Sequence, residues 1–521
     1  MKKKKLPIGI QTFSTIRDPK ENYVYVDKTD IAFNLIDNGS YYFLSRPRRF
    51  GKSLFLDTLS EIFKGSKQLF EGLAIYDKWD WNQSYPVINI SFAVGEFFSR
   101  ETIKDRISTI LEHNCINLLI DNDKCKNSQL GTYFENMIRD AFQKPNQKVV
   151  ILIDEYDKPI LDNIHKEDKQ PSTDAREILR NFYSAIKASD AYIKFVFLTG
   201  VSKFSKLNLF SGLNNLNDIT IDTDYSTITG YTHDDIINEF SEYTHNVDLE
   251  EVRCWYNGYN YFGEPIYNPF DILLFFSKNA VFSNYWWETG NPSFLIEILK
   301  KSNYNLPELE NIIVSKETLS AFDIEHIDVV ALLWQTGYLT FDKEINIFGR
   351  ITYKMKIPNR EIQISLNALF LDYLTNINGQ KAQIQNNVAI SLLELKFDVF
   401  KQNIHSLFAS ISYTGYVNNN IGIYEGYYVS VVFAFLSSIG LDIVLEDHTN
   451  KGRIDMTIKT PDTIFILEFK VDVPEETAIQ QIKTKKYYEK YLFENKTIYL
   501  LGMHFSSTEK NIVGFDWEIF K

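Results

Sequence analysis

The chain has 521 residues, too many for one ordinary hydrophobic core, so we expect two to four domains. Its 44% hydrophobic and 15% aromatic content is typical of globular folding, and its formal charge of −13 argues against a coating of nucleic acid, although a local basic groove is compatible with it. Three cysteines are too few for a disulfide framework. The start lacks the apolar run of a secretory signal, and no apolar window is long enough to cross a bilayer, so we expect a cytoplasmic protein without membrane contact.

The first informative segment combines an apolar run, a basic loop and a helical pattern. Residues 41–45 read YYFLS, residues 45–53 read SRPRRFGKS, and residues 53–65 show apolar residues at helical spacing up to a glycine. The ending G-K-S is typical of phosphate-binding loops, in which Lys52 would reach the outer phosphates of a nucleotide and the Ser53 hydroxyl would bind Mg²⁺. This order predicts a strand, a nucleotide-binding loop and a helix.

Arginines crowd the front of this loop. Where the usual pattern has its first glycine this chain has Arg46, so we expect that part of the loop to have a different shape. Guanidinium groups suit phosphate oxygens or nucleic acid, and they also solvate surface loops, so these alternatives stay open. The candidate nucleotide-binding residues of the loop are Arg46, Arg48, Arg49, Phe50, Gly51, Lys52 and Ser53.

Two further apolar runs, 148–158 and 192–204, are typical of strands buried on both faces of a parallel sheet, and residues 174–189 between them form a helical pattern. This alternation predicts an α/β core. At the end of the first run, Asp154 can enter a Mg²⁺ shell, and Glu155 can orient or deprotonate the attacking water. At the end of the second, Thr199 and Ser202 are candidates for sensing the γ-phosphate, although each motif alone is also compatible with a solvated strand end.

The pattern changes after residue 290. Residues 326–341 are helical and residues 345–359 suggest a hairpin, an order that indicates a winged-helix-like module. The third block has a helix near 421–439, two strands at 453–460 and 463–471, and a basic helix near 475–491. We therefore expect three parts, which are 1–290 (phosphate-loop domain), 291–375 (winged-helix-like segment) and 376–521 (carboxyl-terminal domain).

The carboxyl-terminal strands carry a second set of charged residues. Glu468 and Lys470 are two apart on one strand, so they share a face of the sheet, and a tight hairpin brings Asp455 beside them. Two carboxylates can hold Mg²⁺, while the lysine positions the water that attacks a phosphodiester. An exposed, salt-bridged strand would show the same spacing, so this alternative stays open.

Several motifs together resemble a known family. The strings YYFLSRPRRFGKSLFLDTL (41–59), VVILIDEYDKPILDN (149–163), FVFLTGVSKFS (195–205) and NYWWETGNPSFL (284–295) are similar to bacterial AAA-ATPase-like proteins, which are common in gut anaerobes. The resemblance implies an ATP-binding, AAA-like P-loop fold, in which arginine at the first-glycine position is usual. Such proteins typically end in a PD-(D/E)xK nuclease-like domain, so the resemblance covers most of the chain.

The second set of charged residues is similar to the PD-(D/E)xK arrangement. In that resemblance Asp455, Glu468 and Lys470 form the nuclease centre, and Glu425 completes the metal shell from an upstream helix. Three downstream residues, Gln481, Lys483 and Tyr487, are placed to meet a nucleic-acid backbone, whereas Glu446 is an alternative acid ranked below Glu425.

We therefore expect an ATP-binding and ATP-hydrolysing protein that uses Mg²⁺ and acts on nucleic acid, more readily DNA than RNA. The alternative is a nucleotide-dependent switch or assembly protein whose last domain binds nucleic acid or a protein without cutting. AAA relatives often act as rings, so a homo-oligomer is compatible with the resemblance, but spacing assigns no arginine finger.

Overall fold

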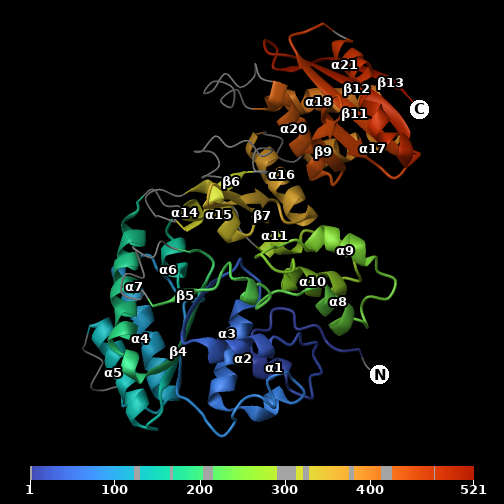
Figure 1. Ribbon diagram of the computed structural model, residues 1–521. Helices are drawn as coiled ribbons and strands as arrows, with labels where there is room; N and C mark the ends of the chain where they lie inside the picture. Colours follow the sequence, from blue (N-terminus) through green and yellow to red (C-terminus); the bar gives the residue numbers. More distant parts are fainter. Residues whose placement is uncertain are drawn as a thin grey trace. The chain divides into compact units, whose positions relative to one another are not determined.

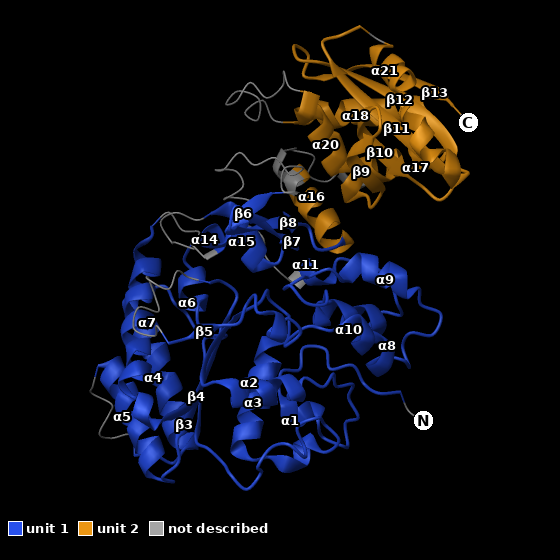
Figure 2. Ribbon diagram, viewed as in Figure 1, with its two compact units in different colours: residues 1–297, 311–359 blue, residues 298–310, 360–521 orange. Residues whose placement is uncertain are grey.

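The computed structural model describes residues 3–121, 129–164, 168–203, 215–289, 312–320, 328–374, 381–411, 425–474 and 476–520. The chain forms two compact units (Figure 2). Unit 1 contains residues 1–297 and 311–359, and unit 2 contains residues 298–310 and 360–521. The segment expected at 291–375 is shared between the two units, and the three-part division remains a prediction.

Unit 1 is built on a five-stranded sheet with the order β2-β3-β4-β1-β5, in which every neighbouring pair is parallel. The three central strands, β3, β4 and β1, are nearly continuous apolar runs, which is typical of parallel strands with both faces covered. The expected α/β parallel-sheet core is confirmed. Its strands are β1 (Tyr41–Ser45), β2 (Val87–Ser91), β3 (Val149–Asp154), β4 (Ile193–Gly200) and β5 (Asn217–Asp218).

Helices cover both faces of this sheet. In Figure 1, α4, α5 and α7 lie on one side of it, and α1, α2 and α3 lie on the other. The loop–helix prediction is confirmed, because α3 begins directly after Gly51, whose φ is 86°, and ends at Gly65, whose φ is 76°. These helices are α1 (Phe13–Ile16), α2 (Thr29–Asn38), α3 (Lys52–Lys64), η1 (Lys67–Phe70), α4 (Arg100–Asn117), α5 (Leu130–Gln143), α6 (Lys158–Leu161), α7 (Gln170–Ala188) and η2 (Asp190–Tyr192).

The rest of unit 1 consists of short helices and a small sheet. Three of its helices enclose an apolar cluster that includes Ile236, Val252 and Phe275. The small sheet has the order β6-β8-β7 and is antiparallel. Helix α15 lies between β6 and β7 in the chain and ends at Gly337, whose φ is 93°. These elements are η3 (Thr223–Tyr225), α8 (His233–Glu239), α9 (Leu249–Tyr256), α10 (Pro269–Ser277), α11 (Tyr285–Thr289), β6 (Ile313–Ser315), α14 (Lys316–Ser320), α15 (Val329–Thr336), β7 (Thr340–Ile347) and β8 (Arg350–Lys356).

Unit 2 contains a mixed sheet with the order β13-β12-β11-β10-β9, in which only β11 and β12 pair in parallel. Alternate residues of β11 face opposite layers: Ile464 and Ile466 pack with Ile482 of α21, whereas Phe465 packs with Phe397 of α18. The elements are α16 (Arg360–Leu374), α17 (Lys381–Leu393), α18 (Phe397–Ala409), α20 (Glu425–Ser438), β9 (Asp442–Thr449), β10 (Gly452–Lys459), β11 (Thr463–Val471), α21 (Thr477–Lys485), η5 (Tyr487–Glu494), β12 (Thr497–Ser506) and β13 (Asn511–Ile519).

One helix expected from the sequence is shorter than its pattern. The basic run near 475–491 does not form one helix, because Lys486 adopts a left-handed conformation with φ 53° and ends α21. A separate 3-10 segment follows and buries Tyr487 and Tyr491 against the sheet. Residues 412–424, which include the start of the helix expected at 421–439, lie outside the described residues. Within the described part of the chain, no helix is both long enough and apolar enough to cross a membrane.

Two candidate catalytic sites

The phosphate-type loop wraps around its own lysine. The Lys52 ammonium is buried and donates hydrogen bonds to the carbonyl oxygens of Arg46 (2.9 Å) and Pro47 (2.8 Å). Burial lowers the pKa of Lys52, and the charges of Asp154 and Glu155 partly oppose that shift. The loop therefore holds a cation at the amino terminus of α3, where helix N–H groups also favour an anion.

Three of the expected residues meet beside this lysine. Ser53 donates a hydrogen bond to the Asp154 carboxylate at 2.5 Å, and Thr199 donates to the other oxygen of that carboxylate at 2.7 Å. The sheet order explains the meeting, because β4 lies between β1 and β3 and all three strands end at the same edge. A hydroxyl and a carboxylate are oxygen ligands that suit Mg²⁺, so these residues fit a metal-bound nucleotide.

Glu155 follows in a strained conformation with φ 52°, which is uncommon for residues other than glycine. Burial, and secondarily the charge of Asp154, raises the pKa of its carboxyl. Backbone strain and perturbed pKa values tend to occur at functional sites. The arrangement is compatible with the expected role of Glu155 as the residue that orients water.

The Arg46 carbonyl contacts Lys52, but the Arg46 side chain is bonded to other parts of the fold. Its guanidinium is buried, donates to the carbonyl oxygens of Ser45 (3.0 Å) and Thr220 (2.6 Å), and stacks on the Tyr261 ring with 3.6 Å to the centroid. Burial lowers the pKa of Arg46 to about 10. The bonding favours a structural role, although contact of Arg46 with nucleotide remains a prediction.

The other loop residues divide between solvent and core. Arg48 and Arg49 are exposed, and the Arg48 carbonyl accepts a hydrogen bond from the Trp286 indole at 3.1 Å. Phe50 is fully buried and packs edge-on against Tyr259. The Arg49 guanidinium lies over the Phe270 ring, 4.9 Å from its centroid, and the buried Phe50 ring anchors the loop.

Asp157, which sequence reasoning did not select, is a buried anchor behind the site. Its carboxylate accepts hydrogen bonds from the backbone N–H groups of Val201 (3.0 Å) and Ser202 (2.6 Å) and from the Ser202 hydroxyl (2.6 Å). Burial raises the pKa of Asp157, and these donors partly oppose the shift. The string D-E-Y-D gives no local signal for this role, because Asp157 stands among charged residues and its partner Ser202 lies 45 residues away. Ser202 is therefore committed to Asp157 rather than aimed at a phosphate.

Gly200 is packed too closely for a side chain, and its replacement tests this anchor. A Cβ atom at Gly200 would lie 2.5 Å from Tyr156 Cε1 and 2.7 Å from an Asp157 oxygen. We expect Gly200→Ala to destabilise the protein by about 1–3 kcal/mol, measured by urea unfolding, because overpacking a filled site forces shifts. Gly426→Ala is the matched control, since a Cβ there meets nothing within 4 Å. Equal midpoints for the two variants would contradict the packing.

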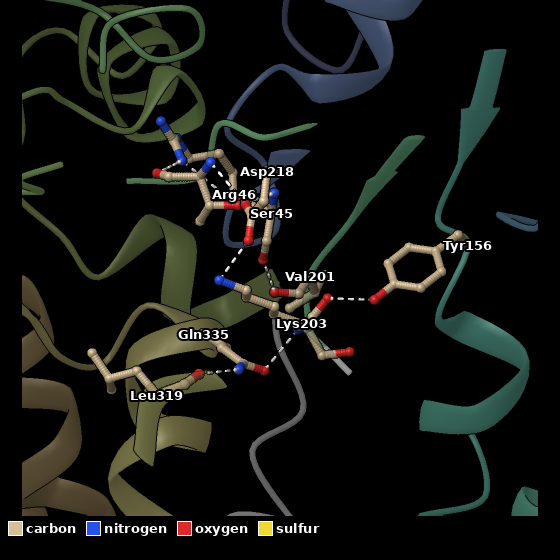
Figure 3. A network of polar contacts seen from close by, with 10 residues as sticks. Ser45, Arg46, Tyr156, Val201, Lys203, Asp218, Leu319 and Gln335 are labelled. Atoms are coloured by element: carbon tan, nitrogen blue, oxygen red, sulfur yellow. Dashed lines mark hydrogen bonds and ion pairs between the residues drawn. The ribbon is translucent and has the colours of Figure 1, made fainter. Parts of the chain in front are cut away.

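A polar network extends from the ends of β1 and β4 to α15 (Figure 3). Lys203 forms an ion pair with Asp218 at 2.5 Å, and its backbone N–H donates to the Gln335 side chain at 3.0 Å. The pKa of Asp218 is lowered: burial alone would raise it, but the positive charge of Lys203 outweighs burial. These bonds attach the segment after Thr199 to α15, a connection that the sequence did not reveal.

The second site is built where β10, β11 and α20 meet. Lys470 lies between two carboxylates, with its Nζ 3.1 Å from Glu468 and 3.4 Å from Glu425. Asp455 accepts a hydrogen bond from the backbone N–H of Phe469 at 2.8 Å, which fixes it beside Glu468. The structure therefore brings together the four residues that the resemblance selected.

The pKa values of two acids of this site are raised. Burial, followed by the charge of Asp455, raises the pKa of Glu468 to about 8. Burial also raises the pKa of Asp455 to about 6. Burial alone would lower the pKa of Lys470, but the negative charges of Glu468, Glu425 and Asp455 raise it. One Glu468 oxygen, Oε2, is buried without a hydrogen-bond partner, so a cation has an acceptor there.

Glu468 should weaken the fold when it ionises, and glutamine should remove that penalty. Its folded-state pKa lies above its ordinary value, so the folded protein loses stability as pH rises from about 4.5 through about 8. In EDTA at pH 9, we expect the free energy of unfolding of Glu468→Gln to exceed that of wild type by on the order of 2 kcal/mol. Near pH 4 the two proteins should have the same free energy of unfolding. Glu446→Gln, exposed on β9, is the control. A variant less stable at pH 9 would contradict the assignment.

The other residues selected from the sequence for this site differ in their contacts. Gln481 donates a hydrogen bond to Glu468 and is itself bonded to Tyr487, so both line the site. Lys483 forms an exposed ion pair with Glu518 at 2.9 Å. Glu446 is exposed and pairs with Arg453 at 3.1 Å, and on β9 it lies between the register partners of Ile454 and Met456. Among the described residues, no group of three or more His, Cys, Asp or Glu side chains already forms a metal-ligand set.

Comparisons with known proteins agree with this geometry. Residues 7–210 match a family model described as a predicted AAA-ATPase, and residues 423–515 match the PD-(D/E)XK nuclease superfamily. A protein of Azotobacter chroococcum mcd 1, described as "Uncharacterized protein in vnfD 5'region", is 44% identical over 521 residues, which is 99% of each chain. The phosphate-type loop and the β10–β11 site lie within the two matched ranges. The chain therefore belongs to the AAA-ATPase-like family and carries a carboxyl-terminal domain of the PD-(D/E)XK nuclease superfamily.

Proposed function

We propose that this protein binds and hydrolyses ATP with Mg²⁺ and that its second unit cleaves nucleic acid, DNA more readily than RNA. The observation that carries the ATPase proposal is the contact of Ser53 and Thr199 with one carboxylate, Asp154, beside the buried ammonium of Lys52. Hydroxyl, carboxylate and ammonium groups at a helix amino terminus are the parts that phosphoryl transfer requires.

In the ATPase site each residue has a distinct role. Lys52 would bind the outer phosphates, Ser53 and Asp154 would hold Mg²⁺, and Thr199 would fix the Asp154 carboxylate. Glu155, at the end of the same strand as Asp154, would orient the attacking water. Arg48 and Arg49 are exposed residues of the loop itself and would contact the phosphates.

In the nuclease-like site Asp455 and Glu468 would hold Mg²⁺, with Glu425 completing the shell. The unpartnered Glu468 oxygen Oε2 supports this assignment, because a buried carboxylate oxygen without a donor can accept a cation. Bound Mg²⁺ would neutralise charge on a phosphodiester and lower the pKa of water. Lys470, 3.1 Å from Glu468, would then position that water.

The direct test measures both activities of the purified full chain. We expect phosphate release from ATP, and nicking of supercoiled DNA, each dependent on Mg²⁺ and abolished by EDTA. Addition of ATP, ADP or a non-hydrolysable analogue to the DNA reaction then tests whether nucleotide state controls cleavage. Absence of both activities over a range of divalent metals would refute the proposal.

A second candidate function is a nucleotide-dependent switch or assembly protein that binds nucleic acid or a protein without cutting. One observation favours it: within the described residues the acids of unit 2 do not form a three-ligand metal set, and Lys470 lies among them. Nucleic-acid binding that persists without cleavage at any divalent metal would select this function. We further propose action in the cytoplasm, and a homo-oligomer is compatible with either function.

A further inference from the structure

The hairpin of β7 and β8 ends in an unusual turn. Ile347 pairs with Arg350, so the turn has two central residues, Phe348 and Gly349, with φ values of 52° and 86°. The Asn346 side chain accepts a hydrogen bond from the Gly349 N–H at 2.8 Å. Two positive φ values are the type I′ pattern, in which asparagine or aspartate is preferred at the first position. We call residues 347–351 the hairpin tip.

Phe348 is a poor residue for this position by every local criterion. A bulky aromatic side chain is strained at positive φ, and Phe348 is fully exposed to solvent, so it stabilises no core. The nearby side chains of Ile347 and Ile351 are 41% and 40% exposed. The base of the hairpin contrasts with this, because Phe341 and Tyr353 are buried and pack against Phe262. A firmly seated hairpin therefore presents an apolar tip to solvent.

The charge of the hairpin indicates what this tip contacts. Residues 340–356 contain four basic residues, Lys343, Arg350, Lys354 and Lys356, against two acidic ones, whereas the whole chain has a charge of −13. Arg350 is mostly exposed and is 3.5 Å from Glu317, an exposed pair that contributes little. Lys354 and Lys356 lie 3.5 and 3.6 Å from Asp342, so four basic and two acidic residues leave the hairpin a net charge of +2. A positive hairpin in an acidic chain is suited to a polyanion.

We propose that the hairpin tip binds nucleic acid at an unpaired base, on which Phe348 stacks while Arg350 contacts a neighbouring phosphate. Nucleic acid is the polyanion that also offers flat apolar faces, so it satisfies both the exposed ring and the charge. Stacking on a base would offset the strain at Phe348. The proposal rests on the proposed nucleic-acid substrate, but it uses no residue of either catalytic site.

The decisive variant is Phe348→Asn, because Asn-Gly is a favoured type I′ turn and should not destabilise the fold. The probe is a forked DNA duplex with 2-aminopurine in its single-stranded arm, bound by protein carrying Asp455→Asn so that it stays intact. We expect Phe348→Asn to bind about tenfold more weakly by anisotropy, to lose the 2-aminopurine quenching and to melt no lower. Arg350→Ala should reduce the slope of log affinity against log salt by about 1.

The matched control is Phe98→Ala, which removes another exposed phenylalanine of unit 1, 56% exposed. Equal binding and quenching by Phe348→Asn and wild-type chains would overturn the proposal while leaving the nuclease assignment intact. If the protein with wild-type Phe348 and Arg350 does not bind the DNA at all, both the hairpin-tip proposal and the proposed nucleic-acid substrate are overturned. Dissociation of a dimer by Phe348→Asn in sedimentation velocity, without any change in DNA binding, would also overturn it, because the tip would then contact a second copy.

Discussion

Replacing Lys52 with methionine is expected to lower ATP turnover by more than about 100-fold, the scale of removing one preorganised charge from a phosphoryl-transfer site. Methionine keeps most of the buried side-chain volume but supplies no cation to the outer phosphates. The hydrogen bonds to the Arg46 and Pro47 carbonyl oxygens are also lost, so the loop should bind nucleotide weakly. Phosphate release and fluorescent-nucleotide titration measure the two effects separately.

The control for this variant is Lys64→Ala, at the other end of the same helix. Lys64 is half exposed and forms only a local ion pair with Glu61 at 2.8 Å, so its loss should leave turnover unchanged. DNA cleavage measured without nucleotide should survive in the Lys52 variant. Hydrolysis at the wild-type rate after Lys52→Met would remove this loop from the ATPase mechanism.

Asp455→Asn is expected to abolish Mg²⁺-dependent DNA nicking, also by more than about 100-fold, without affecting ATP hydrolysis. Asparagine preserves the shape of the side chain and an oxygen that can accept from the Phe469 N–H, so the β10–β11 hairpin should stay intact. What disappears is one negative charge next to Glu468. Because Mg²⁺ binds through one or two carboxylates, loss of one should weaken metal binding directly.

Asp462→Asn is a suitable control, since Asp462 is an exposed turn residue of the same hairpin. Its backbone carbonyl, which accepts from the Thr497 N–H, is unchanged by the substitution. Calorimetric titration of Mg²⁺ should show weaker binding by the Asp455 variant alone. Nicking that persists in this variant at the wild-type rate would remove Asp455 from the proposed cleavage site.

The sequence predicted those parts of the site whose geometry is local. G-K-S at the start of a helix and Asp154 at the end of a buried strand belong to contiguous patterns, and parallel strands end at one edge of the sheet. Glu468 and Lys470 likewise share a face because side chains alternate along a strand. The α/β fold followed from the same patterns of buried strands and intervening helices.

The remaining features depend on distant partners. Arg46 is bonded to Thr220 and stacked on Tyr261, and no pattern near residue 46 reveals those contacts. The end of α21 at Lys486 is set by tertiary packing of Tyr487 and Tyr491, which outweighs the continuous basic helical pattern. Sequence spacing therefore predicts which chemistry is present more readily than which side chains are already committed to the fold.

The burial of Arg46 has a consequence for engineering the loop. A designer who restored glycine there, to match the common phosphate-loop pattern, would leave the Thr220 carbonyl without its donor and the Tyr261 ring without its stacked cation. In this chain a side chain does the shaping that backbone freedom does in other loops. Matching the consensus sequence would therefore not stabilise this loop, because Arg46, which departs from that consensus, holds the loop through its side-chain contacts.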